Sequence, residues 1–182
     1  MSETWLRTNR RAIWFGCIPP LAIALVGLWA MLQADGGGWT GLRWLGTAIC
    51  LIGAASIAML MRELRRPRIA YRDGSVLFYL QSGAPIAVPV GIVEAFFLGQ
   101  GPANLPASID VQQRTTNLVA RLAQRQTDWA NRDVKAALGQ WRDGYVTFRG
   151  TWCEPLNNDV VRRLNQRLKQ VQIQAKQDAK AI

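Results

Sequence analysis

Two long apolar runs near the start of the chain form its strongest pattern. The first, residues 12–32, contains no charged side chain, and the second, residues 42–61, contains only Arg43 near its start. About 20 apolar residues are enough for a helix to cross the hydrocarbon core of a bilayer. A helix of a soluble protein shows polar positions on one face, and neither run does. The pattern predicts a transmembrane helical hairpin.

Basic residues flank the hairpin on its outer ends. They are Arg7, Arg10, Arg11, Arg62, Arg65, Arg66 and Arg68, whereas the connecting loop, residues 33–41, carries only the charge of Asp35. Basic flanks remain in the cytoplasm during membrane insertion. We therefore expect a multi-pass protein of the cell (inner) membrane with both termini cytoplasmic. Residues 1–11 are then a cytoplasmic N-terminal tail, and residues 62–68 are a basic juncture after the second span.

Small residues recur at four-residue spacing along the second run. They are Gly46, Cys50, Ala54 and Ala58. Such a stripe lets a second helix approach closely, so we predict helix packing along it. No charged residue lies in the middle of either run, so a path for protons or ions within one copy lacks its usual residues.

After the juncture the pattern becomes typical of strands. Asp73-Gly74 stands between two apolar stretches of residues 68–80, which predicts a β-hairpin because glycine accepts positive φ. Residues 81–85 make a second turn. Residues 86–98 continue as β-rich chain, in which Pro89 and Gly91 indicate an edge strand or a bulge. The domain therefore begins with three strands.

The second half of the domain mixes strand and helix patterns. Residues 115–122 fit an alternating strand and also a helical face, and we favour the strand. Asp128 is a candidate N-cap for a short helix through Leu138, with Gly139 as its stop. Asn157 or Asn158 caps a C-terminal helix whose apolar positions recur at helical spacing: Val161, Leu164, Leu168 and Val171. We expect this helix to dock on the sheet and to fray after Gln172.

One eight-residue pattern occurs twice. Residues 71–78 read Tyr-Arg-Asp-Gly-Ser-Val-Leu-Phe, and residues 141–148 read Trp-Arg-Asp-Gly-Tyr-Val-Thr-Phe. The match predicts two similar hairpins. It arises either from an internal duplication or from the convergence of two Asp-Gly turns between apolar strands.

The order of these elements resembles bacterial membrane proteins with a pleckstrin-homology-like cytoplasmic domain. The resemblance is carried by residues 68–97, including Val-Pro-Val-Gly-Ile-Val-Glu at 88–94, and by the helix at 160–171. It implies an α+β domain over residues 69–172, with an antiparallel, curved sheet closed at one end by an amphipathic C-terminal helix, and a frayed tail over 173–182. The predicted helix near 128–138 departs from the simplest version of that fold.

The composition argues against catalysis. The chain has no histidine, which removes Ser-His and Cys-His nucleophile pairs and the commonest transition-metal ligand. Cys17 and Cys50 lie in the predicted spans, so Cys153 is the single cysteine of the soluble part. The neighbouring carboxylate of Glu154 raises the pKa of its thiol, which makes the thiol less reactive. We expect buried packing of Trp152 and Cys153, no enzyme activity, no cofactor and no metal site.

The net charge of +10 points to lipid partners. Residues 1–68 hold eight basic and three acidic residues, and residues 69–182 hold fourteen and nine, so each part carries +5. A basic domain beside an anionic leaflet is attracted to it, which is a simpler interpretation than nucleic-acid binding. The basic cluster Arg62, Arg65, Arg66 and Arg68 is a candidate headgroup site, although a topology signal alone also explains it.

Two classes of function remain open at this point. In the first, the chain is a membrane-anchored, non-catalytic module whose domain binds a protein partner or the bilayer surface. In the second, it is an accessory or assembly subunit of a larger membrane enzyme or transporter, or a homo-oligomer, which packs through Cys50, Ala54 and Ala58. A fold does not decide between these classes, because function resides in specific sites.

Overall fold

The structure is a computed structural model of the 182-residue chain, and it describes residues 2–33, 40–102 and 114–178. The chain divides into two compact units. Residues 10–66 form a helical unit, and residues 1–9 together with 67–182 form a folded domain. The domain combines antiparallel sheets with a long helix, so the predicted α+β layout is confirmed.

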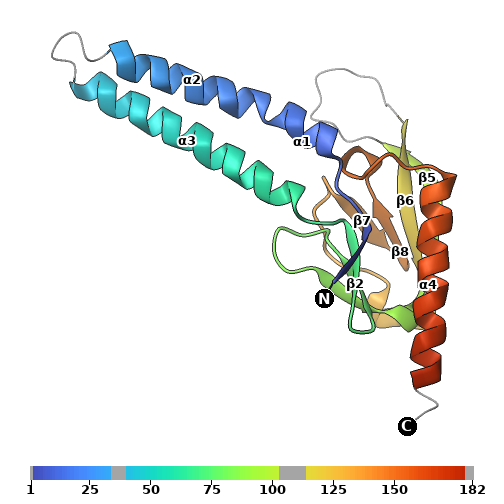
Figure 1. The fold of residues 1–182 in the computed structure, drawn as a ribbon. Helices are drawn as coiled ribbons and strands as arrows, with labels where there is room; N and C mark the ends of the chain where they lie inside the picture. Colours follow the sequence, from blue (N-terminus) through green and yellow to red (C-terminus); the bar gives the residue numbers. More distant parts are fainter. Residues whose placement is uncertain (1, 34–39, 103–113, 179–182) are drawn as a thin grey trace. The chain divides into compact units, whose positions relative to one another are not determined.

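The helical unit consists of α1 (Arg10–Gly16), α2 (Ile18–Gln33) and α3 (Thr40–Leu64). Pro19 and Pro20 lie in the first turn of α2, where their missing backbone donors cost no intrahelical hydrogen bond. This explains why the first apolar run is divided between α1 and α2. The helices α2 and α3 lie side by side in an antiparallel pair (Figure 1).

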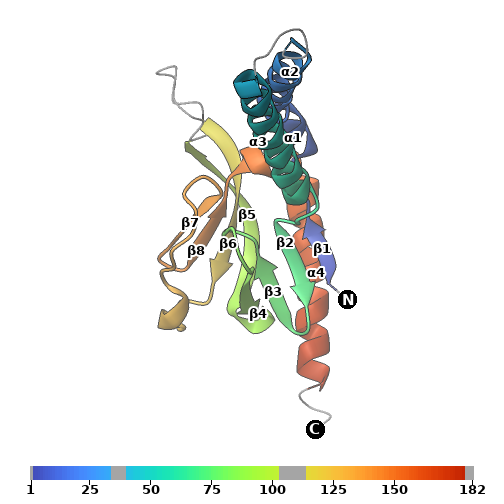
Figure 2. The same cartoon turned by 90° about the vertical axis from the view of Figure 1, so that its left-hand side faces the viewer.

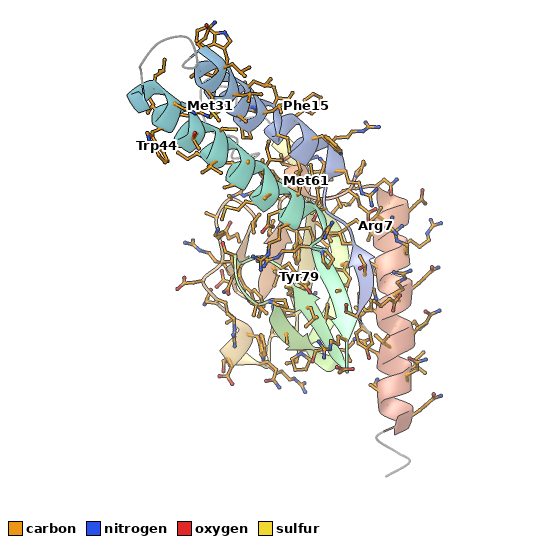
Figure 3. All side chains as sticks on the ribbon, turned by 60° about the vertical axis from the view of Figure 1, so that its left-hand side comes forward. Arg7, Phe15, Met31, Trp44, Met61 and Tyr79 are labelled. Atoms are coloured by element: carbon orange, nitrogen blue, oxygen red, sulfur yellow. The ribbon has the colours of Figure 1, made fainter. Side chains whose placement is uncertain are left out.

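The surface of this helical pair is apolar. The segments Arg10–Gln33 and Gly41–Leu64 are long and apolar enough to cross a membrane, and only 11% of the residues in each apolar window are buried. Large apolar side chains point outward, among them Phe15, which is 72% exposed, and Trp44, which is 76% exposed (Figure 3). A core helix of a soluble protein buries such residues. The exposure agrees with the predicted association with a membrane.

The first sheet has four antiparallel strands in the order β1-β2-β3-β4 (Figure 2). They are β1 (Glu3–Leu6), β2 (Ile69–Arg72), β3 (Ser75–Phe78) and β4 (Ile86–Pro89). The predicted tail at residues 1–11 therefore needs correction, because its residues 3–6 pair with β2 as an edge strand. Sequence periodicity missed this strand because four residues are too few to show alternation.

The second sheet also has four antiparallel strands, in the order β5-β6-β8-β7. They are β5 (Val93–Pro102), β6 (Arg114–Leu122), β7 (Gly139–Arg142) and β8 (Tyr145–Phe148). The strand predicted at 115–122 is confirmed as β6. A 3-10 turn, η2 (Val90–Ile92), follows Pro89 and separates β4 from β5, so the β-rich stretch 86–98 serves both sheets.

The two repeated hairpins have the same geometry. Asp73 and Asp143 have φ of 48° and 53°, and Gly74 and Gly144 both have φ of 76°. In each hairpin the arginine before the turn pairs with the residue after it. The predicted pair of similar hairpins is confirmed. Their last aromatic residues, Phe78 and Phe148, meet edge to face in the core, with ring centroids 5.2 Å apart.

The helix predicted at 128–138 is wrong. Only one 3-10 turn, η3 (Thr127–Trp129), forms there. Two backbone groups of the segment bond to neighbouring elements: Gly144 N donates to Ala130 O at 2.9 Å, and Lys135 N donates to Leu80 O at 3.0 Å. Tertiary pairing of this kind overrides the weak helical preference of a short segment.

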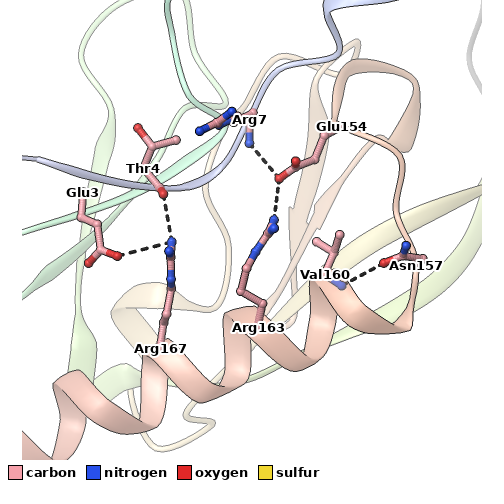
Figure 4. Close-up of polar contacts among 8 residues, drawn as sticks. All are labelled: Glu3, Thr4, Arg7, Glu154, Asn157, Val160, Arg163 and Arg167. Atoms are coloured by element: carbon pink, nitrogen blue, oxygen red, sulfur yellow. Dashed lines mark hydrogen bonds and ion pairs between the residues drawn. The ribbon is translucent and has the colours of Figure 1, made fainter.

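The C-terminal helix α4 runs from Asn158 to Asp178. Its cap is Asn157, because Val160 N donates to Asn157 Oδ1 at 2.9 Å (Figure 4). One side of the helix is buried in the core through Val160, Leu164, Leu168 and Val171. The predicted fraying after Gln172 is wrong for residues 173–178, because α4 continues as a helix to Asp178, while residues 179–182 lie outside the described residues. The domain therefore extends to Asp178.

The helix α4 also makes hydrogen bonds to one edge strand of each sheet. Asn165 Oδ1 accepts from Phe96 N at 2.8 Å, and Asn165 Nδ2 donates to Phe96 O at 2.8 Å, so its amide replaces a neighbouring strand at the edge of β5. On the other sheet, an Nη of Arg167 donates to Thr4 O at the edge of β1. Unpaired strand edges are otherwise sites of unwanted association.

Candidate functional site

The contact between α2 and α3 depends on glycine. A Cβ atom added to Gly27 would lie 2.6 Å from Cys50 N and 2.8 Å from Gly46 O. One added to Gly53 would lie 2.8 Å from Pro20 O. Real Cβ atoms do not approach backbone atoms this closely, so the two helices reach this separation only because these positions lack side chains.

The predicted small-residue stripe of α3 is divided by this contact. Gly46 and the backbone of Cys50 face α2, whereas Ala54 and Ala58 are exposed. Half of the stripe thus serves packing within the chain. Gly27 and Gly53 were missed by the sequence reasoning. In the first apolar run, Ala24, Gly27 and Met31 recur at three- and four-residue spacing. This spacing would have predicted the side of α2 that faces α3.

The basic cluster is also divided. Arg62 and Arg65 are exposed, and Arg66 forms an ion pair with Glu63 at 3.3 Å. Arg68 is only 4% exposed, and its Nε donates to Trp152 O at 3.2 Å. A side chain held inside the domain cannot reach lipid headgroups. The candidate headgroup set is therefore corrected to Arg62, Arg65 and Arg66.

The segment before the hairpin is paired with the chain that follows it. Arg68 N donates to Leu6 O at 2.8 Å, which joins the two chain segments that flank the helical unit in sequence. Asn9 N donates to Trp152 O at 3.0 Å, and Glu154 N donates to Arg7 O at 3.0 Å. We call residues 3–9 with these partners the N-terminal clasp.

Charged side chains of α4 support the N-terminal clasp (Figure 4). Arg163 pairs with Glu154 at 2.8 Å, and the same carboxylate accepts a hydrogen bond from Arg7 N at 3.3 Å. Arg167 pairs with Glu3 at 3.3 Å. These side chains are partly exposed, so each ion pair contributes at most about 1 kcal/mol. The clasp is held mainly by backbone pairing and by burial of Trp5 and Leu6.

The thiol of Cys153 has no features of a nucleophile. The pKa of this thiol is raised to about 12, mainly by burial; the Arg68 guanidinium acts to lower it and the Glu154 carboxylate acts to raise it. The thiolate is the reactive form, so the group stays neutral and inert at physiological pH. The expected burial of Cys153 is confirmed, whereas Trp152 is only partly buried.

No group of three or more His, Cys, Asp or Glu residues that could hold a metal ion occurs within residues 2–33, 40–102 and 114–178. The contacts described above are packing contacts, hydrogen bonds and ion pairs. No family model, curated protein or solved structure matches the chain. The likeness to pleckstrin-homology-like membrane proteins stays a prediction.

Proposed function

We propose that the chain is a membrane-anchored, non-catalytic interaction module that presents a small basic, pleckstrin-homology-like domain at the cytoplasmic face of the cell membrane. The N-terminal clasp is the observation that carries this proposal. Residues 3–9 precede the hairpin and residues 67–178 follow it, yet both belong to one folded domain. A hairpin that spans a bilayer twice returns the chain to the side from which it started, so both parts of the domain lie on one side and can pair.

Further features support the domain type and its side of the membrane. The resemblance implies one curved antiparallel sheet with a C-terminal helix. The domain has antiparallel strands and such a helix, but its strands form two four-stranded sheets, with the order β5-β6-β8-β7 in the second. The exposed Arg62 and Arg65 follow the hairpin directly, which favours a cytoplasmic domain. Each basic side chain near an anionic leaflet contributes about 1 kcal/mol of attraction.

Reporter fusions test the topology. A reporter in the loop at residues 33–41 should be active outside the cytoplasm, and one after Ile182 should be active inside it. If both reporters are active on the same side, the hairpin does not span the membrane and the proposal fails. As a second arm, exchanging Trp5 for Asp should leave both reporters unchanged, because insertion depends on the apolar runs and the basic flanks.

A second function is favoured by the exposed Ala54 and Ala58 on α3. In this alternative the chain is an accessory or assembly subunit, and these positions pack against a helix of a larger membrane enzyme or transporter. Affinity purification from mild detergent distinguishes the two. The subunit alternative is supported if a stoichiometric membrane partner is lost with Ala54→Ile and kept with the control Ala48→Ile. A partner that is kept with both variants supports the module.

A further inference from the structure

The strand β7 is the last strand of the second sheet, and no described strand pairs with its outer edge (Figure 2). Arg142 and Tyr145 flank the two-residue turn between β7 and β8, so they exchange both of their backbone hydrogen bonds. Hydrogen-bonded and non-hydrogen-bonded pairs alternate along antiparallel strands. Trp141 and Val146 therefore form a non-hydrogen-bonded pair, and the backbone N–H and C=O of Trp141 point away from β8 toward the outer edge.

The loop that follows η3 pairs with this outer edge on both sides of Trp141. Asp143 N donates to Asn131 Oδ1 at 3.2 Å, and Gly139 N donates to Lys135 O at 3.1 Å. Between these two bonds, neither backbone group of Trp141 has a hydrogen-bond partner among the residues that the structure describes. One donor and one acceptor of the strand are thus left side by side at the edge.

A cleft of about 320 Å³ lies at this place, lined by β7 and by residues of the same loop. Trp141 lines the cleft although it is only 2% exposed. Its indole is engaged elsewhere, since the ring stacks on Trp129 and Nε1 donates to Trp129 O at 2.7 Å. What Trp141 presents to the cleft is therefore its main chain.

One positive charge at the cleft has no partner in the domain. Among the described residues, the charged side chains of the lining are Arg132, Arg142, Arg149 and Asp133. The Arg132 guanidinium lies over the Trp129 ring at 4.3 Å, and Arg149 is buried. Arg142 is exposed, and no described residue forms an ion pair or a hydrogen bond with its side chain. Its charge is available to a ligand.

The first hairpin shows what occupies the equivalent position there. Tyr71 holds in β2 the position that Trp141 holds in β7, because the two hairpins share their sequence pattern and their turn geometry. By the same alternation the backbone groups of Tyr71 point toward β1, where Glu3 is its partner in the register. At β7 the bonds to Asn131 and Lys135 lie on either side, so a bound chain has room to pair through one residue only.

We propose that this cleft binds the carboxyl-terminal end of a partner protein's peptide chain. The N–H of the last residue donates to Trp141 O, and the terminal carboxylate accepts from Trp141 N beside the Arg142 guanidinium. A chain end fits because only one residue can pair here, and its negative charge complements Arg142. The volume is at the lower limit of the roughly 300–1,000 Å³ of ligand sites, which suits a chain end better than a long segment.

This inference rests on the proposed function as an interaction module and gives that module a class of partner. The cleft lies within the folded domain, so binding there does not depend on the topology of the hairpin. The reporter fusions and the peptide titration can therefore fail independently of each other.

The experiment titrates the full chain, in detergent micelles, with acetyl-trialanine that has a free carboxyl group, and measures binding by calorimetry. We expect saturable binding with a dissociation constant below about 5 mM. Two matched probes each lack one group: methylation of the last amide nitrogen removes the donor, and amidation of the carboxyl end removes the charge. Each should bind at least about tenfold more weakly. Equal binding of the three probes, or no saturable binding, would overturn the proposal.

Hydrogen exchange locates the bound peptide. Residues 139–142 should exchange more slowly when acetyl-trialanine is bound, because the Trp141 amide gains an acceptor. Residues 69–72 of the first hairpin are the internal control, since β1 already pairs with them, and their exchange should not change. Protection at other residues without protection at 139–142 would place the peptide at another site and refute the assignment.

A pair of equivalent arginines tests the role of the charge. Arg142 and Arg72 directly precede the two turns, and both are exposed. Arg142→Gln should weaken binding of the free-carboxyl probe at least about threefold and leave the amidated probe unaffected, because the lost charge acts on the carboxylate. Arg72→Gln should change neither, and thermal unfolding confirms that both variants are folded. Equal effects of the two variants would contradict the position of the carboxylate beside Arg142.

Discussion

Shortening Trp5 to alanine should destabilise the folded domain by about 3–5 kcal/mol, the usual cost of removing a buried aromatic side chain. Trp5 is 1% exposed, although it belongs to an edge strand of four residues. Its ring stacks on Tyr71 with centroids 5.4 Å apart and planes inclined by 11°. Small domains are stable by about 5–15 kcal/mol in total, so the loss is a large share of the free energy of unfolding.

Two further substitutions separate ring packing from other effects. The indole Nε1 of Trp5 is buried and has no hydrogen-bond partner among the described residues, so Trp5→Phe loses no hydrogen bond. We expect it to cost clearly less than Trp5→Ala, since most of the ring contact is kept. Thr4→Ala changes an exposed neighbour on the same strand and should shift stability by no more than about 0.5 kcal/mol.

Thermal unfolding of the full chain in detergent, followed by near-ultraviolet circular dichroism, measures these differences. The Trp5→Ala protein should unfold more than about 10 °C below the wild type. Trypsin should also cut its domain faster, because the N-terminal clasp opens. Equal unfolding temperatures for Trp5→Ala and Thr4→Ala would show that β1 is not part of the core, and the topological argument built on the clasp would fall with it.

Three other predictions follow from single contacts. Gly53→Val should separate α2 from α3, because the added side chain meets Pro20 O. It should therefore lower the thermal stability of the helical pair in detergent. The control Ala55→Val, at an exposed position, should not. Gly74→Ala forces a Cβ atom into a turn with φ of 76° and should cost about 1 kcal/mol in a urea titration; no loss would contradict the turn geometry. Burial on folding raises the pKa of the Cys153 thiol from 9.0 to about 12, so the unfolded chain ionises first as the pH rises. Stability should therefore fall above pH 9 by about 1.4 kcal/mol per pH unit, and Cys153→Ala should remove that part of the slope.

Local signals in the sequence predicted the elements that depend on few residues. Asp73-Gly74 was sufficient for the first hairpin, since the turn requires positive φ at both positions. Asn157 and the apolar spacing after it predicted the start and the buried side of α4. The alternation of residues 115–122 predicted β6, although the same residues also fitted a helix.

The elements that were missed depend on distant partners. β1 exists because β2 offers an edge more than sixty residues later in the chain, and no local pattern of four residues shows this. The segment after Asp128 is not a helix because its carbonyl and amide groups bond to Leu80 and Gly144. A hollow beside Asn117 on the second sheet could not be predicted for the same reason, because the strands that line it, β5 to β8, come together only in the fold.

The N-terminal clasp also has a consequence for biosynthesis. Residues 3–6 are synthesised first, but their partner strand β2 becomes available only after both apolar helices have been made. Pairing over such a sequence distance is slow, because the loop must close before the contact forms. If the hairpin spans the membrane as proposed, a chain that inserts only one helix leaves the two segments on opposite sides of the bilayer, and the strand at 69–72 keeps an open edge. Under the proposed topology, the pairing of β1 with β2 therefore requires that both helices have inserted.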